Sequence, residues 1–471
     1  MTSPASTAFH GSSLLWRESA HSHAAPLLPF LRQIGSAQLD ERVRPQRRVA
    51  VIGSGIAGLS AAWALSTQAQ VTLFEAADYF GGHTNTVDVT LEGITHGVDT
   101  GFLVFNERTY PLLIELFAQL GVDVAASEMS FSVQSRADRL EWSGSDLNGV
   151  FAQRANLLRP AFYGMLADLL RFNKLATALA TSGHESALAQ PIGDFLAEHR
   201  FGTAFRDWYL LPMVACIWSC PTAQMMAFPI STLIRFCHNH GLLQISERPQ
   251  WFTVRGGAKH YVEKMLPRIA DARLSSPVTG IQRDEIDGKS GVTVHSARGA
   301  ERFDELVMAC HSDQSLRLLG DGATVPERQV LGAIGYHRNR AVLHTDTALL
   351  PQRQRAWAAW NYERGDAQKE GHAVCLHYLL NRLQPLPWTQ PVVVSLNPLR
   401  EPAADKTLAE FDYAHPVFDR AAVAAQAGVP SLQGQGHTWF CGAWTRYGFH
   451  EDGLLSGLTV AHRLSNRWAA A

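Results

Sequence analysis

The chain has 471 residues, of which 46% are hydrophobic and 18% charged, and its formal net charge is −2. This composition is typical of a globular protein with two or three structural units. The near-neutral charge gives no basis for a nucleic-acid partner or for strong attraction to anionic lipid. No apolar run reaches the ~18 residues of a membrane span. The longest candidate, residues 208–218, contains Pro212.

The cysteines indicate the redox environment. All six lie in apolar surroundings: Cys216, Cys220, Cys237, Cys310, Cys375 and Cys441. Their spacing lacks the paired pattern of a zinc site, so we expect buried free thiols and no metal. Free thiols fit a reducing compartment, and we therefore expect a cytoplasmic location.

Residues 1–46 precede the first strong pattern. They are rich in Ser, Ala, His, Pro and Arg, with one amphipathic piece at residues 27–34. The charged, apolar and cleavage regions of a signal peptide do not occur in order. We expect a disordered extension. An over-extended gene start and a docking arm are the alternatives.

The most informative stretch follows at once. An apolar run over residues 49–52 predicts a buried parallel strand, and Gly53, Gly55 and Gly58 then form a G-x-G-x-x-G turn that opens a helix. A second strand ends on Glu75, 22 residues after the first glycine. The glycines allow a tight turn, close approach of a pyrophosphate and close helix packing, and the acid can accept ribose hydroxyls. Together they predict a dinucleotide site at a helix N-terminus.

The residues after the acid favour FAD over NAD. Segment 75–84, which contains Gly81, Gly82 and His83, resembles the Glu-Ala-x-x-x-x-Gly-Gly-Arg-Thr continuation of amine-oxidase flavoproteins. The second glycine pair supplies more backbone amides near the pyrophosphate. His83 departs from this pattern because arginine is usual there. Histidine is not a fixed cation at pH 7, so the departure weakens one phosphate contact.

The rest of the chain returns to the nucleotide fold twice. Before each return lies a long segment, and we call these segments the first excursion (residues 106–249) and the second excursion (residues 312–435). We predict an α/β fold, with a Rossmann-like FAD-binding domain of the amine-oxidase type and an interleaved α+β substrate domain. The FAD-binding domain is expected from residues 47–105, 250–311 and 436–471. The substrate-binding domain is expected from residues 106–249 and 312–435.

Periodicity gives the main elements of the excursions. A helix is expected within residues 106–120, two strands of a small sheet at 131–134 and 140–142, and apolar helices from 147 to about 241. We favour a protein core for these helices, with a lipid-binding wall as the alternative. Further strands are expected at these positions: 341–344, 373–380, 392–396 and 438–443.

Taken together, the N-terminal glycine motif and the C-terminal segment 438–457 make residues 48–468 resemble the FAD-dependent amine oxidase and phytoene desaturase superfamily. Within it, the chain looks most like bacterial predicted NAD/FAD-binding flavoproteins, which resemble the flavoprotein domain of plant cyclopropane fatty acid synthases. Segments 336–346, 440–444 and 447–453 carry this closer match. The resemblance implies non-covalent FAD, a fatty acyl substrate and a possible lipid methyltransferase partner.

The resemblance also implies which residues contact FAD. They come from glycine turns and helix N-termini: Gly53, Gly55, Ala57, Gly58, Glu75, Gly81, Gly82, His83, Gly101, Phe102, Val278, Gly442, Ala443, His450, Glu451 and Leu454. Glu75 would bind the adenosine ribose and Val278 the adenine. Gly101 and Phe102 would line the flavin ring. The helix that begins near His450 would point its N-terminal amides at the pyrimidine end, where its dipole stabilises the anionic reduced flavin.

Catalytic residues are harder to predict, because flavin itself accepts the hydride. The protein need only orient the substrate, exclude water from the site and transfer a proton. Amine oxidases of this superfamily carry a lysine near flavin N5, and the matching position here falls at Asn339 or Arg340. Phe449 matches one half of their aromatic pair. The polar candidates for catalysis are His337, Arg340, Tyr413, His415 and Tyr447. A purely structural role is an equal alternative for each.

These features predict a FAD-dependent oxidoreductase that dehydrogenates, reduces or isomerises an apolar substrate, which we expect to be a fatty acyl chain. One alternative is an amine oxidase that uses oxygen. Another is a non-catalytic flavin-bearing partner of a lipid methyltransferase. We expect at most peripheral membrane contact, through an exposed apolar patch at residues 208–218 or 225–233.

Overall fold

The computed structural model describes residues 24–37, 46–182, 190–218, 225–244, 248–286, 289–365 and 374–470. Its nucleotide-binding half is built on a five-stranded parallel sheet in the order β10-β2-β1-β14-β20. The strands are β1 (Arg48–Ile52), β2 (Gln70–Phe74), β10 (Asp271–Arg273), β14 (Glu305–Met308) and β20 (Thr438–Phe440). Residues 49–52 are buried. This is why the first strand reads as a continuous apolar run: both faces of a parallel sheet are covered.

Helices α3 (Ile56–Leu65) and α18 (His450–Ala469) pack against each other beside this sheet. Every residue of α3 is buried. A Cβ placed on Gly457 of α18 would lie 2.2 Å from the carbonyl oxygen of Ala57. Only glycine therefore permits this close contact, which joins the first helix of the fold to the last.

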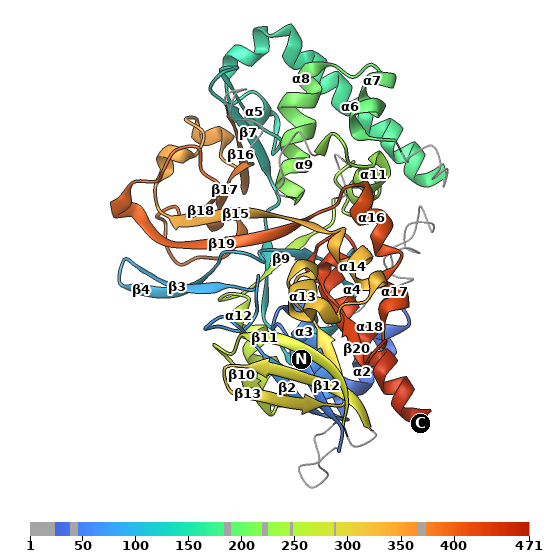
Figure 1. Cartoon of the computed structure of the whole chain (residues 1–471). Coiled ribbons are helices and arrows are strands. Elements are labelled where there is room, and N and C mark those ends of the chain that lie inside the picture. Colours follow the sequence, from blue (N-terminus) through green and yellow to red (C-terminus); the bar gives the residue numbers. More distant parts are fainter. Residues whose placement is uncertain are drawn as a thin grey trace.

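Two smaller antiparallel units flank the parallel sheet in Figure 1. One is the three-stranded sheet of β11 (Val278–Ile286), β12 (Lys289–Ser296) and β13 (Gly299–Phe303), and the other is the hairpin of β3 (Thr86–Leu91) and β4 (Ile94–Asp99). A third sheet joins β5 (Phe105–Asn106), β9 (Trp251–Val254) and β6 (Val124–Ser127). Helices α4 (Pro111–Leu120) and α12 (Lys259–Met265) pack together.

The two excursions meet in one seven-stranded sheet, ordered β19-β15-β18-β17-β16-β7-β8. Its strands are β7 (Phe131–Ser135), β8 (Leu140–Ser143), β15 (Gly335–His344), β16 (Trp360–Arg364), β17 (Cys375–Leu379), β18 (Val393–Leu396) and β19 (Thr407–Val417). The two predicted strands at residues 131–134 and 140–142 are confirmed and pair with each other, but the prediction that their sheet is small is wrong. β7 pairs in parallel with β16, from the second excursion, and this pairing makes one sheet of both.

From residue 147 onward, the described part of the first excursion is helical, as predicted. Its helices, at the top of Figure 1, are α5 (Leu147–Val150), α6 (Pro160–Ser182), α7 (Ile192–Glu198), α8 (Thr203–Phe205), α9 (Leu211–Trp218) and α11 (Ile230–Asn239). A π-helical turn, Arg206–Leu210, leads into α9. None of the helices in the described part of the chain is long and apolar enough to cross a membrane.

The remaining helices lie in the second excursion. They are α13 (Ser312–Leu319), α14 (Val325–Gly332), α15 (Leu380–Leu383), α16 (Arg420–Gln426) and α17 (Val429–Leu432). Helices α13, α14 and α16 pack on one another in series. Buried residues of α14 and α16 share a core cluster with strands of the parallel sheet. Part of this excursion therefore supports the nucleotide-binding half.

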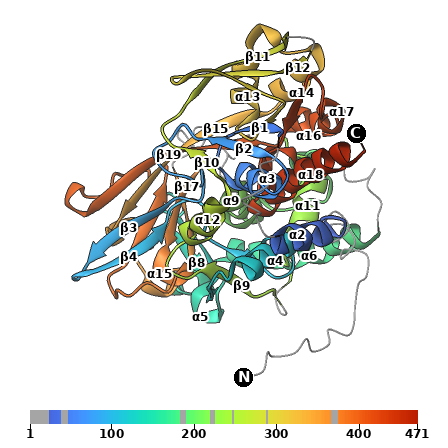
Figure 2. The ribbon, with the colours of Figure 1, turned by 90° about the horizontal axis from the view of Figure 1, so that it is seen from below.

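The predicted disorder of residues 1–46 is wrong for helix α2 (Leu27–Ser36). Its apolar face, which includes Leu31 at 0% exposure, is buried. The helix packs on α4 and α18, and Figure 2 shows it beside α4. Arg32 pairs with Glu115 of α4 at 2.9 Å, and the Arg268 guanidinium donates to the carbonyl of Ile34 at 2.6 Å. The amphipathic piece thus completes the core instead of extending from it.

Candidate functional site

A cavity of about 990 Å³ lies between the parallel sheet and the seven-stranded sheet. The glycine turn after β1, the first turns of α3 and α18, and strands β7, β16 and β19 all contribute to its wall. Such a position, at the carboxyl ends of parallel strands, is where doubly wound folds bind ligands. Part of its lining, the nucleotide arm, comes from the glycine turns, and part, the apolar arm, comes from the two excursions.

The first turn of α3 borders the nucleotide arm. Gly55 is the N-cap of α3, with φ −60° and ψ 171°. A Cβ at Gly55 would meet nothing within 4 Å, so this residue faces open space. Ile56 and Ala57 line the cavity beside it. The N–H groups of a first helical turn have no partner within the helix, and with the helix dipole they suit a pyrophosphate.

Glu75 stands at the end of β2 and anchors the turn. Its Oε2 accepts hydrogen bonds from the backbone N–H and the hydroxyl of Ser54, at 2.9 and 2.6 Å. Its Oε1 accepts from the backbone N–H of Ala77 at 2.9 Å. A carboxylate offers about four acceptor positions. Glu75, which lines the cavity, can therefore hold the turn and still bind a ribose hydroxyl.

His83 occupies the position where the resemblance leads one to expect arginine. Its ring centroid lies 5.1 Å from that of Tyr413 and 5.2 Å from that of His415. Burial, assisted by His415 and His311, lowers the pKa of His83 well below its usual value, so the ring is neutral at pH 7. Its Nε2 is buried and has no partner among the described residues. His83 thus offers a hydrogen-bonding nitrogen to a ligand, and the phosphate charge is left to helix and turn amides.

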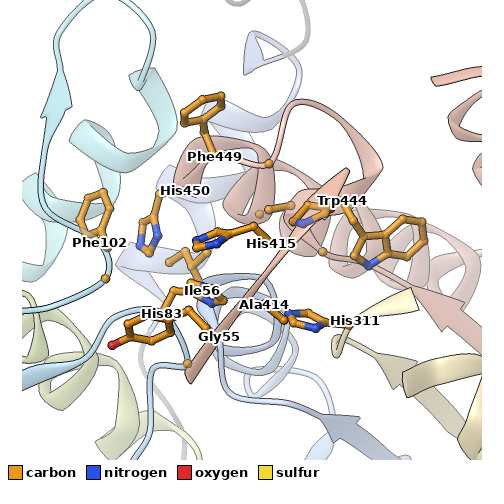
Figure 3. A pocket seen from close by; sticks show the side chains of 18 of the residues that line it. Gly55, Ile56, His83, Phe102, His311, Ala414, His415, Trp444, Phe449 and His450 are labelled. Carbon is orange, nitrogen blue, oxygen red and sulfur yellow. The ribbon is translucent and has the colours of Figure 1, made fainter. Parts of the chain in front are cut away.

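His415 is the best-defined polar group beside the cavity in Figure 3. The side-chain amide of Asn339 donates to its Nδ1 at 2.8 Å, and Asn397 fixes Asn339 in turn by donating to Oδ1 at 2.7 Å. Burial lowers the pKa of His415 to about 4. The ring is therefore neutral, and because Nδ1 accepts, its proton lies on Nε2.

The N-terminus of α18 forms the opposite wall. His450 stacks on Phe102 with ring centroids 3.8 Å apart, and its Nε2 shares a hydrogen bond of 2.8 Å with the hydroxyl of Tyr261. Burial lowers the pKa of His450 to about 3. Phe449, the N-cap of α18, stacks on Phe236 of α11 at 4.7 Å. Figure 3 shows Phe449, His450 and His415 around one part of the cavity.

The second arm of the cavity, the apolar arm, is walled by the excursions. Its wall includes Met129, Phe131, Met213, Ile217, Trp360 and Tyr378. Among the described residues that line the whole cavity, the acids are Glu75, at the ribose position, and Asp412. Asp412 is 60% exposed and pairs with Arg338 at 3.0 Å. The apolar arm therefore offers van der Waals contact and dryness rather than charge.

Fifteen of the twenty-one predicted site residues line the cavity: Gly53, Gly55, Ala57, Glu75, Gly81, Gly82, His83, Gly101, Phe102, Val278, Tyr413, His415, Gly442, Ala443 and His450. Six do not: Gly58, His337, Arg340, Tyr447, Glu451 and Leu454. The prediction that these six residues contact the cofactor or the substrate is therefore not supported by the lining of the cavity. Glu451 instead caps helix α4, since its two carboxylate oxygens accept from the backbone N–H groups of Leu112 and Leu113 at 2.8 and 3.0 Å.

Arg340, on β15, does not line the cavity. Its guanidinium pairs with Glu401 at 2.9 Å and Glu410 at 2.8 Å. Sequence reasoning missed His311 and Tyr336, which line the cavity and stack at 4.5 Å. A signal for His311 existed, because it follows β14 at the carboxyl edge of the parallel sheet, where ligands bind.

With this geometry in place, the comparisons with known proteins identify the class. The model of the flavin-containing amine oxidoreductase family matches residues 56–344. The chain therefore belongs to this family and is a FAD-dependent oxidoreductase. The open space at Gly55, the first-turn amides of α3 and the unpartnered nitrogen of His83 fit a bound FAD. A comparison with curated proteins gives no match.

Solved structures show the same fold. A CLA-producing fatty acid isomerase from P. acnes is 17% identical, with a TM-score of 0.62, covering 89% of this chain and 99% of that one. Cyclohexylamine oxidase from Brevibacterium oxydans is 16% identical, with a TM-score of 0.65 and 90% and 100% coverage. A putative protoporphyrinogen oxidase from Exiguobacterium sp. is 16% identical, with a TM-score of 0.63 and the same coverage. At these identities the likeness shows the fold alone.

Proposed function

We propose that this FAD-dependent oxidoreductase dehydrogenates, reduces or isomerises a fatty acyl chain. The observation that supports the proposal most is the apolar arm, whose walls come from both excursions. Each buried CH₂ contributes about 0.8 kcal/mol to binding. A long chain would gain affinity along such an arm, whereas a small polar substrate would not.

The charges around the cavity also weigh against an amine. An alkylamine is a cation at pH 7, and an ammonium ion taken out of water needs a carboxylate or several acceptors. The one acid besides Glu75 in the described lining, Asp412, is largely exposed and already paired with Arg338. Amine oxidation is the second candidate. The fold neighbours that are amine oxidases favour it, as does the aromatic wall at Phe449.

The protein's own residues supply position, dryness and hydrogen bonds. The amides at the start of α3 would hold the pyrophosphate, and Glu75 would hold the ribose. When bound, FAD supplies the hydride acceptor or donor. The neutral Nε2–H of His415 can donate a hydrogen bond to a substrate or to the cofactor. The apolar arm keeps water from the reacting carbon.

The likeness to flavoproteins of the cyclopropane fatty acid synthase type, which the sequence suggests, would agree with an acyl substrate, but the comparisons do not support it and it stays a prediction. It rests on segments 336–346, 440–444 and 447–453. It also motivates a lipid methyltransferase as partner. If the immobilised flavoprotein retained such an enzyme but lipids caused no change in flavin absorbance, the result would support the alternative of a non-catalytic flavin-bearing partner.

A substrate that is a membrane lipid would have to enter from a bilayer surface. The predicted contact segments are core: Trp218 and Met225, for example, are 5% and 0% exposed. Of the nine exposed large apolar side chains among the described residues, five lie near the start of the helical excursion: Leu147, Leu157, Leu158, Tyr163 and Leu170. We propose that this group, the leucine patch, touches the bilayer reversibly. Liposome co-sedimentation should weaken in Leu158→Asp but not in Val325→Asp, an exposed control on α14.

Anaerobic mixing tests the function. The flavin-loaded protein is mixed with unsaturated free fatty acids, with phospholipid vesicles or with primary alkylamines. Loss of the oxidised-flavin band with acyl lipids, or a moved double bond detected by gas chromatography, supports the proposal. Reduction by amines alone would contradict it and support the amine-oxidase candidate.

A further inference from the structure

Three side chains with metal-binding atoms meet in the seven-stranded sheet, away from the flavin cavity. They are Glu363 of β16 and Cys375 and His377 of β17, and each is at most 4% exposed. The Nε2 atom of His377 lies 3.1 Å from Oε2 of Glu363 and 3.5 Å from Sγ of Cys375. The thiol and the carboxylate are 4.0 Å apart.

Strand pairing brings these residues together. Glu363 pairs with Cys375 across the antiparallel β16 and β17, and His377 is two residues further along β17. Side chains at such positions share one face of a sheet. The alternate residues Trp360 and Tyr378 lie on the other face, where they line the flavin cavity. The cluster is therefore directly behind the cavity wall.

The separations fit a tetrahedral ion. Zinc bonds of about 2.0–2.1 Å to nitrogen and oxygen and 2.3 Å to sulfur require ligand atoms roughly 3.3–3.6 Å apart. The observed separations of 3.1, 3.5 and 4.0 Å bracket this range. As a direct hydrogen bond the thiol–carboxylate contact is long and weak. A shared ion satisfies all three groups better than they satisfy one another.

The surrounding hydrogen bonds allow His377 to act as a ligand. Its Nδ1 lies 2.7 Å from the hydroxyl of Ser395. That hydroxyl also bonds Nε2 of His344 at 2.6 Å, and Nδ1 of His344 accepts from the backbone N–H of Asp346 at 3.0 Å. Ser395 accepts one hydrogen bond from His344, and its second lone pair can accept another from the Nδ1–H of His377, a tautomer that leaves the Nε2 lone pair for a metal. Metal-bound histidines usually have such a partner on the second nitrogen.

The charges leave one carboxylate oxygen for the ion. Oε1 of Glu363 faces the guanidinium groups of Arg400 and Arg136, at 3.8 and 3.9 Å. Both arginines are partly exposed, so this side also gives access from solvent. Oε2 is directed to His377 and Cys375. A zinc ion bound by one thiolate and one carboxylate would be neutral overall, and the displaced thiol proton would pass to solvent.

We propose that Glu363, Cys375 and His377 bind a zinc ion, with water as the fourth ligand. A hydrolytic role for Ser395, His377 and Glu363 is less consistent with the structure, because Ser395 and His377 are both 0% exposed. A bound ion would join β16 to β17, the strands that carry Trp360 and Tyr378.

The test uses the flavin-loaded protein equilibrated with buffered zinc sulfate. Elemental analysis should find one zinc per chain, and X-ray absorption at the zinc edge should find one sulfur neighbour at about 2.3 Å. Cys375→Ser keeps the size of the side chain but removes the thiolate. It should lower zinc affinity at least about a hundredfold, beyond the usual effect of losing a surrounding hydrogen bond. Cys237→Ser is the matched control, since Cys237 is also a buried free thiol.

Flavin absorbance and far-ultraviolet circular dichroism report whether each variant folds. If Cys375→Ser fails to fold, the sulfur signal of the unaltered protein still decides the matter. Zinc bound without a sulfur neighbour would overturn the proposal. So would equal zinc affinity in a folded Cys375→Ser variant, or no stoichiometric zinc in the unaltered protein. The three side chains would then form only a hydrogen-bonded cluster.

Discussion

Two glycines of the same turn should fail in different ways when each becomes alanine. A Cβ at Gly55 would meet nothing within 4 Å, and the φ of −60° suits alanine. Gly55→Ala should therefore fold with normal stability but occupy the space of the pyrophosphate. Loss of one charge-assisted hydrogen bond costs about 1.5–3 kcal/mol, which corresponds to a roughly 10- to 150-fold weaker flavin affinity.

At Gly58 the expected defect is in folding. A Cβ there would lie 1.8 Å from the carbonyl oxygen of Gly53 and 3.1 Å from Cβ of Ala309. Backbone atoms cannot move aside as a flexible side chain can, so α3 must shift away from the sheet. Overpacking of this kind costs about 1–3 kcal/mol or more, and the apoprotein itself should unfold at lower urea concentration.

The assay for both variants is urea unfolding of the apoprotein, followed by fluorescence titration with FAD. Gly164→Ala is the control, because Gly164 also has open space around its Cβ but lies on α6, outside the cavity. Full flavin affinity in Gly55→Ala would refute the placement of the pyrophosphate. Normal stability of Gly58→Ala apoprotein would refute the packing argument.

Three further predictions follow from the site. Glu75→Ala should lower FAD affinity roughly tenfold to a hundredfold by loss of the ribose acceptor, measured by equilibrium dialysis; unchanged affinity would place the ribose elsewhere. Acid precipitation should release all flavin into the supernatant, because burial disfavours the nucleophilic thiolate of both cysteines that line the cavity: it raises the pKa of Cys310 to about 11 and that of Cys216 well above its usual value. Flavin in the pellet would contradict non-covalent binding. His240 and His415 have folded pKa values of about 4, below the unfolded value of about 6.5. Their stabilisation is therefore complete above pH 6.5 and declines as the pH falls toward 4, by roughly 2 kcal/mol each down to pH 5. His415→Gln should flatten the dependence of the urea midpoint on pH in this window, and an unchanged slope would show that His415 is not buried in its neutral form.

The nucleotide half could be predicted from sequence because its signals are local. The apolar run of β1, the glycine spacing and Glu75 lie within a single βαβ unit, and the structure places them as expected. The seven-stranded sheet could not be predicted in this way. Its parallel pairing of β7 with β16 joins strands from the two excursions. The local sequence of neither strand indicates which distant strand it pairs with.

Side-chain direction limited the catalytic candidates. Asn339 and Arg340 are neighbours on β15, yet Asn339 bonds His415 beside the cavity while Arg340 pairs with two glutamates and does not line the cavity. Successive residues of a strand point to opposite faces, so an uncertainty of one position reverses the assignment. Hydrophobicity likewise could not distinguish core from surface. Trp218 is buried, whereas Leu158 is 88% exposed.

The cluster of Glu363, Cys375 and His377 illustrates the same limit. Cysteine spacing along the chain carries no signal for it, because only one of its three side chains is a cysteine. Cys375 and His377 are close in sequence, but Glu363 joins them only through the register of two strands. Such a cluster becomes visible once the pairing is known.

The central claim, that the apolar arm receives an acyl chain, is tested most directly by chain-length dependence of binding. Saturated fatty acids and matched n-alkylamines of increasing length are titrated into the flavin-loaded protein, and the dissociation constant is read from the flavin difference spectrum. Each added CH₂ should tighten fatty-acid binding about fourfold, equivalent to about 0.8 kcal/mol, until the arm is full. At each length the acid should bind more tightly than the amine. Binding that does not depend on length, or tighter binding of the amines, would contradict the account.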